Sequence, residues 1–140
     1  MTPVFLEDLQ IGQSAEMVRT VKAEDLTAFA EVTGDSTPVH LDEAYAAQTP
    51  FGGRIAHGML SAGYISAVIG TRLPGPGAIY IGQSLRFRRP VRIGDTVTAR
   101  VEIAAIDLER ARVTLKTTCV VAGVCVLDGE AQIMAPRRAG

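Results

Sequence analysis

The sequence contains only two cysteines, only two histidines and no excess of either charge. Cys119 and Cys125 do not have the spacing of metal ligands. If Ala122-Gly123 forms a two-residue hairpin turn, Cys125 faces Val120 and Cys119 points to the opposite face, whereas a register one residue different would allow a disulfide. We expect two free thiols and therefore a reducing, cytoplasmic location.

The chain also lacks the charge and the apolar length that nucleic-acid-binding and membrane proteins need. Its 14 basic and 15 acidic residues give a formal net charge of −1, so the chain lacks the excess of positive charge that attracts a phosphate backbone. The longest stretch without charge, residues 55–71, is shorter than the about 20 apolar residues of a membrane span. The first residues have no basic segment before an apolar run, so we expect no secretory signal. We expect neither a nucleic-acid partner nor a membrane.

Apolar periodicity predicts one α+β domain over residues 1–140. It indicates helices over 24–33, 42–47 and 58–72, and strands over 15–21, 79–88, 96–105, 111–119 and 124–135. The helix over 58–72 is apolar on all sides, which is typical of a buried helix. Long antiparallel strands after one such helix predict a curved sheet wrapped around it. We expect Gly34 to end the first helix and Asp128-Gly129 to form a bulge.

The central stretch of the sequence combines a carboxylate, both histidines and a predicted helix that begins with glycine. Asp35 precedes His40 by five residues in a loop that Pro38 stiffens, so the two side chains are placed to meet in one small volume. A carboxylate and an imidazole can act as general acid and base. Gly58 opens the central helix, where unpaired N–H groups and a positive dipole end favour a developing oxyanion. The stretch therefore predicts an acid/base site followed by an oxyanion-binding helix start.

Residues 29–46 read F-A-E-V-T-G-D-S-T-P-V-H-L-D-E-A-Y-A. This segment resembles the hydratase signature of the MaoC-like, (R)-specific enoyl-CoA hydratase family, in which an aromatic residue precedes a G-D-x-N-P-x-H core. Nearly every specified position matches, and the departure is Thr37, where the family usually has asparagine. The resemblance extends from about Ala23 to Pro136 and includes I-A-H-G-M at 55–59, L-P-G at 73–75, G-Q-S-L-R-F at 82–87 and G-D at 94–95.

The resemblance implies a hot-dog fold, in which a curved antiparallel sheet wraps a long buried central helix. It implies reversible, metal-free hydration of a trans-2-enoyl-CoA to an (R)-3-hydroxyacyl-CoA, with Asp35 and His40 as the acid/base pair. It also implies that Gly58 binds the thioester oxygen and that Ser66 is a polar contact to the substrate. Coenzyme A is part of this substrate, so no separate cofactor is expected. A homodimer with sites near the subunit interface is the expected assembly.

Other interpretations of the same residues remain open at this level. The enzyme could be a hot-dog dehydratase or thioesterase acting on another acyl thioester, such as one on acyl carrier protein. It could also be a non-catalytic acyl-thioester-binding subunit, for which Thr37 is the only hint. Asp35 could instead be a turn residue that bonds its own backbone. His57 is expected to position the helix start rather than to react.

Two further groups of residues are weighed and left out of the predicted site. His40, His57 and one carboxylate have the composition of a facial metal triad, but the hydratase chemistry needs no metal. Arg86, Arg88 and Arg89 carry the charge to meet the phosphates of coenzyme A, but such a cluster is more often a solvated face.

Overall fold

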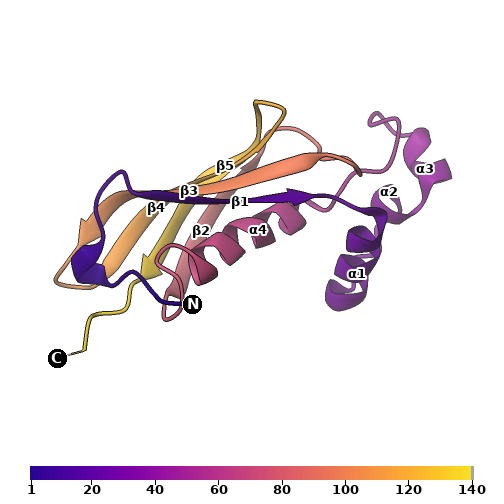
Figure 1. The fold of residues 1–140 in the computed structure, drawn as a ribbon. Coiled ribbons are helices and arrows are strands. Elements are labelled where there is room, and N and C mark those ends of the chain that lie inside the picture. Colours follow the sequence, from indigo (N-terminus) through magenta and orange to yellow (C-terminus); the bar gives the residue numbers. More distant parts are fainter. Residues whose placement is uncertain (140) are drawn as a thin grey trace.

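The computed structural model describes residues 1–139 as five antiparallel strands and four α-helices. The elements are the 3-10 turn η1 (Leu6–Asp8), β1 (Ser14–Thr20), α1 (Ala23–Thr33), α2 (Pro38–Leu41), α3 (Glu43–Ala47), α4 (Gly58–Thr71), β2 (Ile79–Phe87), β3 (Thr96–Asp107), β4 (Arg112–Val121) and β5 (Val124–Met134). The strands form one sheet in the order β1-β3-β4-β5-β2 (Figure 1), and every pairing is antiparallel. The α+β arrangement expected from the sequence is confirmed. Within residues 1–139 no helix has the length and apolar character needed to cross a membrane.

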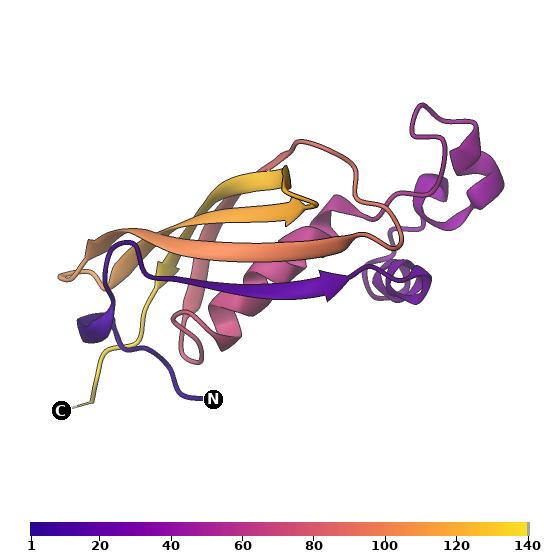
Figure 2. The ribbon, with the colours of Figure 1, turned by 45° about the horizontal axis from the view of Figure 1, so that its top comes forward.

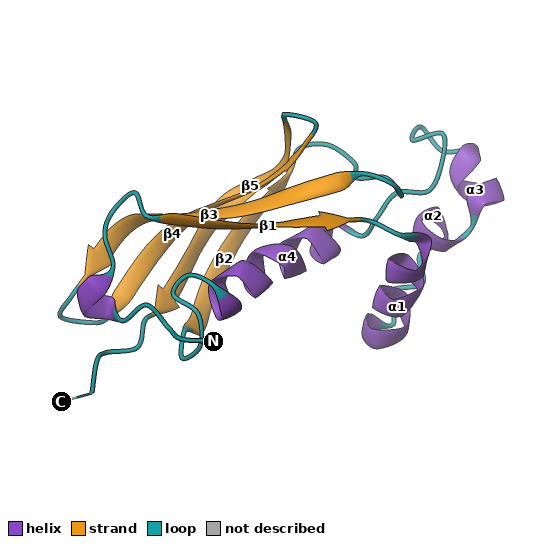
Figure 3. Ribbon diagram, in the orientation of Figure 1, coloured by secondary structure: helices purple, strands orange, loops and turns teal. Residues whose placement is uncertain are grey.

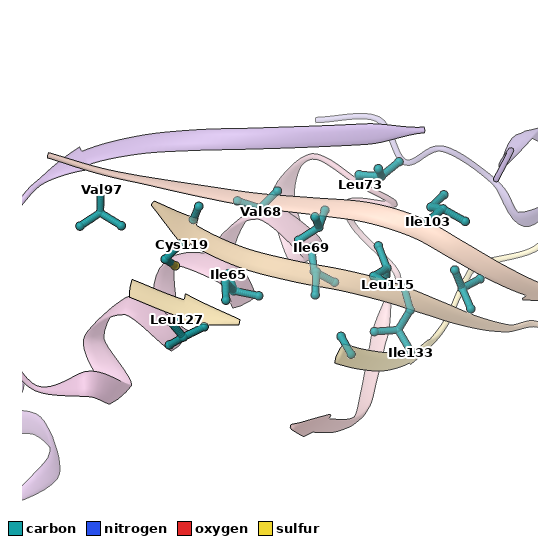
Figure 4. Close-up of a cluster of buried hydrophobic side chains, with 14 of the residues drawn as sticks. Ile65, Val68, Ile69, Leu73, Val97, Ile103, Leu115, Cys119, Leu127 and Ile133 are labelled. Carbon is teal, nitrogen blue, oxygen red and sulfur yellow. The ribbon is translucent and has the colours of Figure 1, made fainter. Parts of the chain in front are cut away.

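Helix α4 lies along one face of the sheet and packs against β1, β3 and β4 (Figure 3). Ile65 and Val68 point from the helix into the core and are fully buried, in one cluster with buried strand residues such as Leu115 and Ile133 (Figure 4). The inward positions of β3 and β4 alternate with partly exposed ones, as the two-residue period of the sequence predicted. Burial of this apolar face holds α4 in place and fixes where its first residue lies.

The opposite face of α4 is exposed in the single chain, which differs from the all-round burial expected from its composition. Met59 is 54% exposed, and Gly63, Ser66 and Gly70 are also exposed. The physical reason is that one curved sheet covers only one side of a helix. An apolar helix face without a cover is therefore a feature of the isolated chain.

Helices α1, α2 and α3 lie beyond one end of the sheet, away from the two chain termini (Figure 2). Asp25 accepts a hydrogen bond of 2.9 Å from the N–H of Lys22 at the start of α1. Gly34 ends the helix in the left-handed conformation, with φ of 82°, as expected. The segment that follows, expected to be a loop, contains the single helical turn α2. Pro38 begins that turn because its fixed φ suits the first helical position.

The hairpin between β4 and β5 confirms one sequence prediction and corrects another. Val120 pairs with Cys125 across the turn, and both cysteines are free thiols. The bulge, however, lies at Val126 rather than at Asp128-Gly129, which continue the regular register. The glycine is there for a different reason, because β5 approaches β2 closely at this point.

Replacing Gly129 by alanine is expected to destabilise the protein by about 3 kcal/mol. A Cβ atom at Gly129 would lie 1.9 Å from the backbone oxygen of Ser84 in β2, so the two strands would have to separate. Urea unfolding at a fixed protein concentration measures the loss. Gly82→Ala is the matched control, because a Cβ there meets nothing within 4 Å. Equal stability of the two variants would contradict the close approach of β2 and β5.

Candidate active site

Asp35 directly follows the glycine that ends α1, and its carboxylate is held by the next residues of the loop. Its Oδ1 accepts hydrogen bonds from the Thr37 hydroxyl at 2.5 Å and from the Thr37 N–H at 3.2 Å. These two bonds, the hydroxyl first, hold the pKa of the Asp35 carboxyl below its usual value. Burial opposes the shift, and the nearby His57 and His40 add to the lowering. The carboxylate is therefore kept in its ionised, proton-accepting form.

His40 lies in the single turn of α2, and backbone groups fix its orientation. Its Nδ1 is 2.8 Å from the carbonyl oxygen of Ile55. A carbonyl only accepts, so Nδ1 carries the ring proton and Nε2 is left with a free lone pair. The Arg54 guanidinium donates a bond of 2.7 Å to the carbonyl oxygen of His40 itself. The structure therefore presents an imidazole whose Nε2 can accept or return a proton.

The two candidate acid/base groups come together as the sequence predicted, and a third group joins them. One ligand-type atom from each of Asp35, His40 and His57 lies within 4.8 Å of the others. The His40 and His57 rings are stacked, with centroids 3.9 Å apart and planes 28° from parallel. Nothing in the sequence indicates this stacking beyond the fact that these are the chain's only histidines.

Gly58 is the first residue of α4, and its N–H has no backbone partner among residues 1–139. A Cβ atom at this position would lie 2.5 Å from the ring of Phe87. A side chain at this position would therefore have to displace that ring from the helix start. Gly58 and His40 line the same cavity of about 460 Å³, which the apolar rings of Phe51 and Phe87 also border.

Ser66 lies two turns into α4 and lines a second cavity of about 610 Å³ together with Asp35. Met59, in the first turn of the helix, borders both cavities. The four residues predicted as a site are thus divided between two neighbouring cavities. His40 borders one and Asp35 the other, and ligand-type atoms of these two side chains lie within 4.8 Å of each other.

The cluster has the composition of a site with two histidines and one carboxylate, which some divalent metals prefer. Its geometry does not favour such a site. The two imidazoles stack face to face instead of fanning around one point, and Asp35 Oδ1 is already the acceptor of two hydrogen bonds. We therefore assign no step of the chemistry to a metal.

Several residues that line the cavities were outside the predicted site. Arg88 and Arg89 border the cavity of His40, and Arg88 also pairs with Asp128 at 3.1 Å. Tyr80 and Gln83 border the cavity of Asp35, and the Tyr80 hydroxyl is hydrogen-bonded to the Gln83 side chain. Their positions follow from the pairing of β2 with β5, which the strand pattern alone does not reveal.

The chain is similar to proteins whose activity is named. It is 55% identical over 134 residues to the (R)-specific enoyl-CoA hydratase of Rhodospirillum rubrum, covering 96% of this chain and 93% of that protein. It is 53% identical over 135 residues to the 3-hydroxybutyryl-CoA dehydratase of Methylorubrum extorquens, covering 96% of this chain and 86% of that one.

A solved structure and a family model agree with these relatives. The unliganded R-hydratase PhaJ1 of Pseudomonas aeruginosa superposes with a TM-score of 0.92 at 50% identity, covering 97% of this chain and 88% of that chain. The family model described as the MaoC like domain matches residues 8–125. The sheet wrapped on α4 is thus the hot-dog fold, and the chain belongs to the MaoC-like family.

Proposed function

We propose that the protein is an enoyl-CoA hydratase that reversibly adds water to a trans-2-enoyl-CoA and forms an (R)-3-hydroxyacyl-CoA. The observation that carries the proposal is the Asp35–His40 pair beside the open N-terminus of α4. The hydratase and dehydratase names of the relatives describe the two directions of one such equilibrium. A high overall identity over nearly the whole chain supports the same activity here.

In this mechanism Asp35 and His40 hold one water molecule between the carboxylate and the free Nε2 of the imidazole. As the water oxygen attacks the β-carbon, one of its protons passes to the pair. A proton returns to the α-carbon, so the enzyme ends the cycle in its starting protonation state. Groups of this kind contribute about 10² to 10⁴-fold each in rate.

The negative charge that develops on the thioester oxygen needs a donor, and we assign this role to the Gly58 N–H. It is unpaired, lies at the positive end of the α4 dipole and is not shielded by a side chain of its own. An oxyanion donor of this type is worth roughly 3–4 kcal/mol. Ser66, in the adjoining cavity, is assigned as a polar contact to the bound acyl group.

Two arginine side chains at the cavity of His40 could bind the phosphates of a coenzyme A thioester. Arg88 and Arg89 border it, and guanidinium groups bind phosphates well. Coenzyme A enters as part of the substrate, and we propose that no separate cofactor or metal takes part. The two free thiols fit a reducing cytoplasm, which is where we place the reaction.

We also propose that the active form is a homodimer with the sites near its interface. Strand β2 is at the edge of the sheet and exposes Ile79 and Ile81, at 58% and 45%. The uncovered face of α4 lies near the same edge strand, since Met59 of α4 and Tyr80 of β2 border the same cavity, that of Asp35. A second copy would cover this apolar surface and the unpaired strand edge. Light scattering of the purified protein tests the proposal, and a monomeric mass would overturn it.

The activity is tested by adding the purified protein to crotonyl-CoA in chelator-treated buffer and following the absorbance of the conjugated enoyl thioester. A fast decay is expected, with a product that an (R)-specific 3-hydroxyacyl-CoA dehydrogenase oxidises. No decay with crotonyl-CoA or with longer enoyl-CoA substrates would overturn the proposal. The chain would then act on a thioester of acyl carrier protein or bind thioesters without turnover.

Replacing Thr37 by valine is expected to move the acidic limb of kcat/KM to higher pH. The variant loses the hydroxyl that contributes most to lowering the pKa of Asp35, while its N–H stays in place. The pKa of the carboxyl then rises, so Asp35 is protonated and inactive as a base at a pH where the wild type still works. The pH profile of crotonyl-CoA hydration measures the shift. Thr37→Ser keeps a hydroxyl and serves as the matched control, and identical limbs in all three proteins would contradict the prediction.

A further inference from the structure

His57 is buried, with 2% of its surface exposed, at the residue that precedes α4. It occupies the N-cap position, and its side chain makes no hydrogen bond to the first turn of the helix. Its Nε2 is instead 3.0 Å from the carbonyl oxygen of Asp35. Because that oxygen can only accept, Nε2 carries the proton and donates it. His57 thus holds the backbone of the residue assigned as the base.

The same ring also supports the other member of the pair. It stacks on His40 at a centroid distance of 3.9 Å and contacts the ring of Phe29 at 4.5 Å. The Nδ1 bond to Ile55 fixes how the His40 ring is rotated in its own plane, and the stack fixes the plane itself. One buried side chain therefore contacts the backbone of Asp35 and the ring of His40, the two residues whose side chains would share the reacting water.

His57 is held in this place at a cost. Its Nδ1 is buried and has no hydrogen-bond partner among residues 1–139. A buried acceptor without a partner is unfavourable, and an apolar ring of similar size would avoid that penalty. Packing alone therefore does not account for a histidine here, whereas the bond from Nε2 to Asp35 does.

From this geometry we infer that His57 is a positioning residue of the reaction, which sets the Asp35 carboxylate and the His40 imidazole against each other. The inference rests on the proposed hydratase function. His57 does not exchange a proton with the substrate. It fixes one partner through its Nε2–H and the other through its ring face. The two contacts make separate predictions, because a substitution can remove one and keep the other.

Two variants separate these contacts. His57→Phe keeps an aromatic ring for the stack and loses the donor to Asp35, while His57→Leu loses both. We expect kcat for crotonyl-CoA to fall about 10-fold in His57→Phe and about 100-fold in His57→Leu, with KM changed by less than about threefold, because misplacement of reacting groups by about 1 Å costs this much. His57→Phe removes the unpartnered nitrogen but also leaves the Asp35 carbonyl without its donor, so its resistance to heat should be close to that of the wild type.

Val68→Ala is the matched control for a general loss of stability. Val68 is fully buried in α4, the helix that follows His57, and it borders neither cavity. Its variant should lose thermal stability and keep kcat. If the His57 variants kept kcat within about threefold, or if Val68→Ala at a similar loss of thermal stability lost as much kcat as they do, the inference would be overturned.

A spectroscopic readout is independent of turnover. In both His57 variants His40 is the only histidine left, so its imidazole nitrogens give a single assignable set of NMR signals. We expect the wild type and His57→Phe to show one tautomer with the proton on Nδ1. His57→Leu should show a mixture, because a ring that the stack no longer holds can turn away from the Ile55 carbonyl that selects this tautomer. A single tautomer in all three proteins would overturn the role of the stack. An inactive wild type with these spectra would refute the proposed function alone.

Discussion

Replacing Asp35 by asparagine is expected to slow hydration of crotonyl-CoA by about 10² to 10⁴-fold while the fold is kept. The asparagine Oδ1 can accept the same two hydrogen bonds from Thr37, so the shape of the loop does not change. What is lost is the negative charge and the basicity that those bonds stabilise. The decay of the enoyl-thioester absorbance gives kcat and KM, and circular dichroism checks the fold.

A neighbouring aspartate provides the control for this substitution. Asp42 accepts a bond of 3.0 Å from the N–H of Tyr45 and caps α3, but it borders neither cavity. Asp42→Asn makes the same chemical change nearby and should keep at least about half of the activity, because asparagine is nearly as good a cap. If Asp35→Asn kept as much activity as Asp42→Asn, Asp35 would not be the base.

The helices and strands follow closely from the sequence because local patterns determine them. Gly58 and the Leu73-Pro74 pair bound the central helix, and the alternation in β3 and β4 identifies the buried face of each strand. The order of the strands does not follow in this way. The chain places β2 beside β5, across two intervening strands, and no hairpin signal marks such a long-range pairing. The bulge at Val126 was missed for a related reason, since the glycine signal at Gly129 reports close contact between strands.

In the candidate site, too, one part could be predicted from the sequence and another could not. Asp35 and His40 are near one another in the chain, so spacing and a stiff loop were enough to predict that they meet. His57 comes from another element, and its stack on His40 depends on how α4 is seated against the sheet. The hydrogen bond from the Thr37 hydroxyl to the Asp35 carboxylate could likewise not be predicted from the sequence, and it helps to hold that carboxylate. Thr37, at the position where the family usually has asparagine, donates its hydroxyl to the Asp35 carboxylate.

Replacing His40 by alanine is the second substitution with a large expected effect. We expect crotonyl-CoA hydration to fall by about 10² to 10⁴-fold, because the Nε2 lone pair that holds and exchanges a water proton is removed. His40 borders the cavity of about 460 Å³, so an imidazole molecule can reach the space that its ring leaves. Adding imidazole to the variant should therefore restore part of the lost rate, and the rescue should saturate.

The control for His40→Ala must show whether a truncated side chain in the short helices α2 and α3 lowers activity by disturbing their structure. Tyr45→Ala removes a large side chain that is 53% exposed on α3 and borders neither cavity, so it should leave kcat nearly unchanged. Imidazole should have no effect on it. A rescue confined to His40→Ala identifies the ring as the chemical group that the reaction uses, because a merely structural defect is not repaired by a freely diffusing base. Loss of activity below about 10-fold in His40→Ala would instead leave Asp35 to act without an imidazole partner.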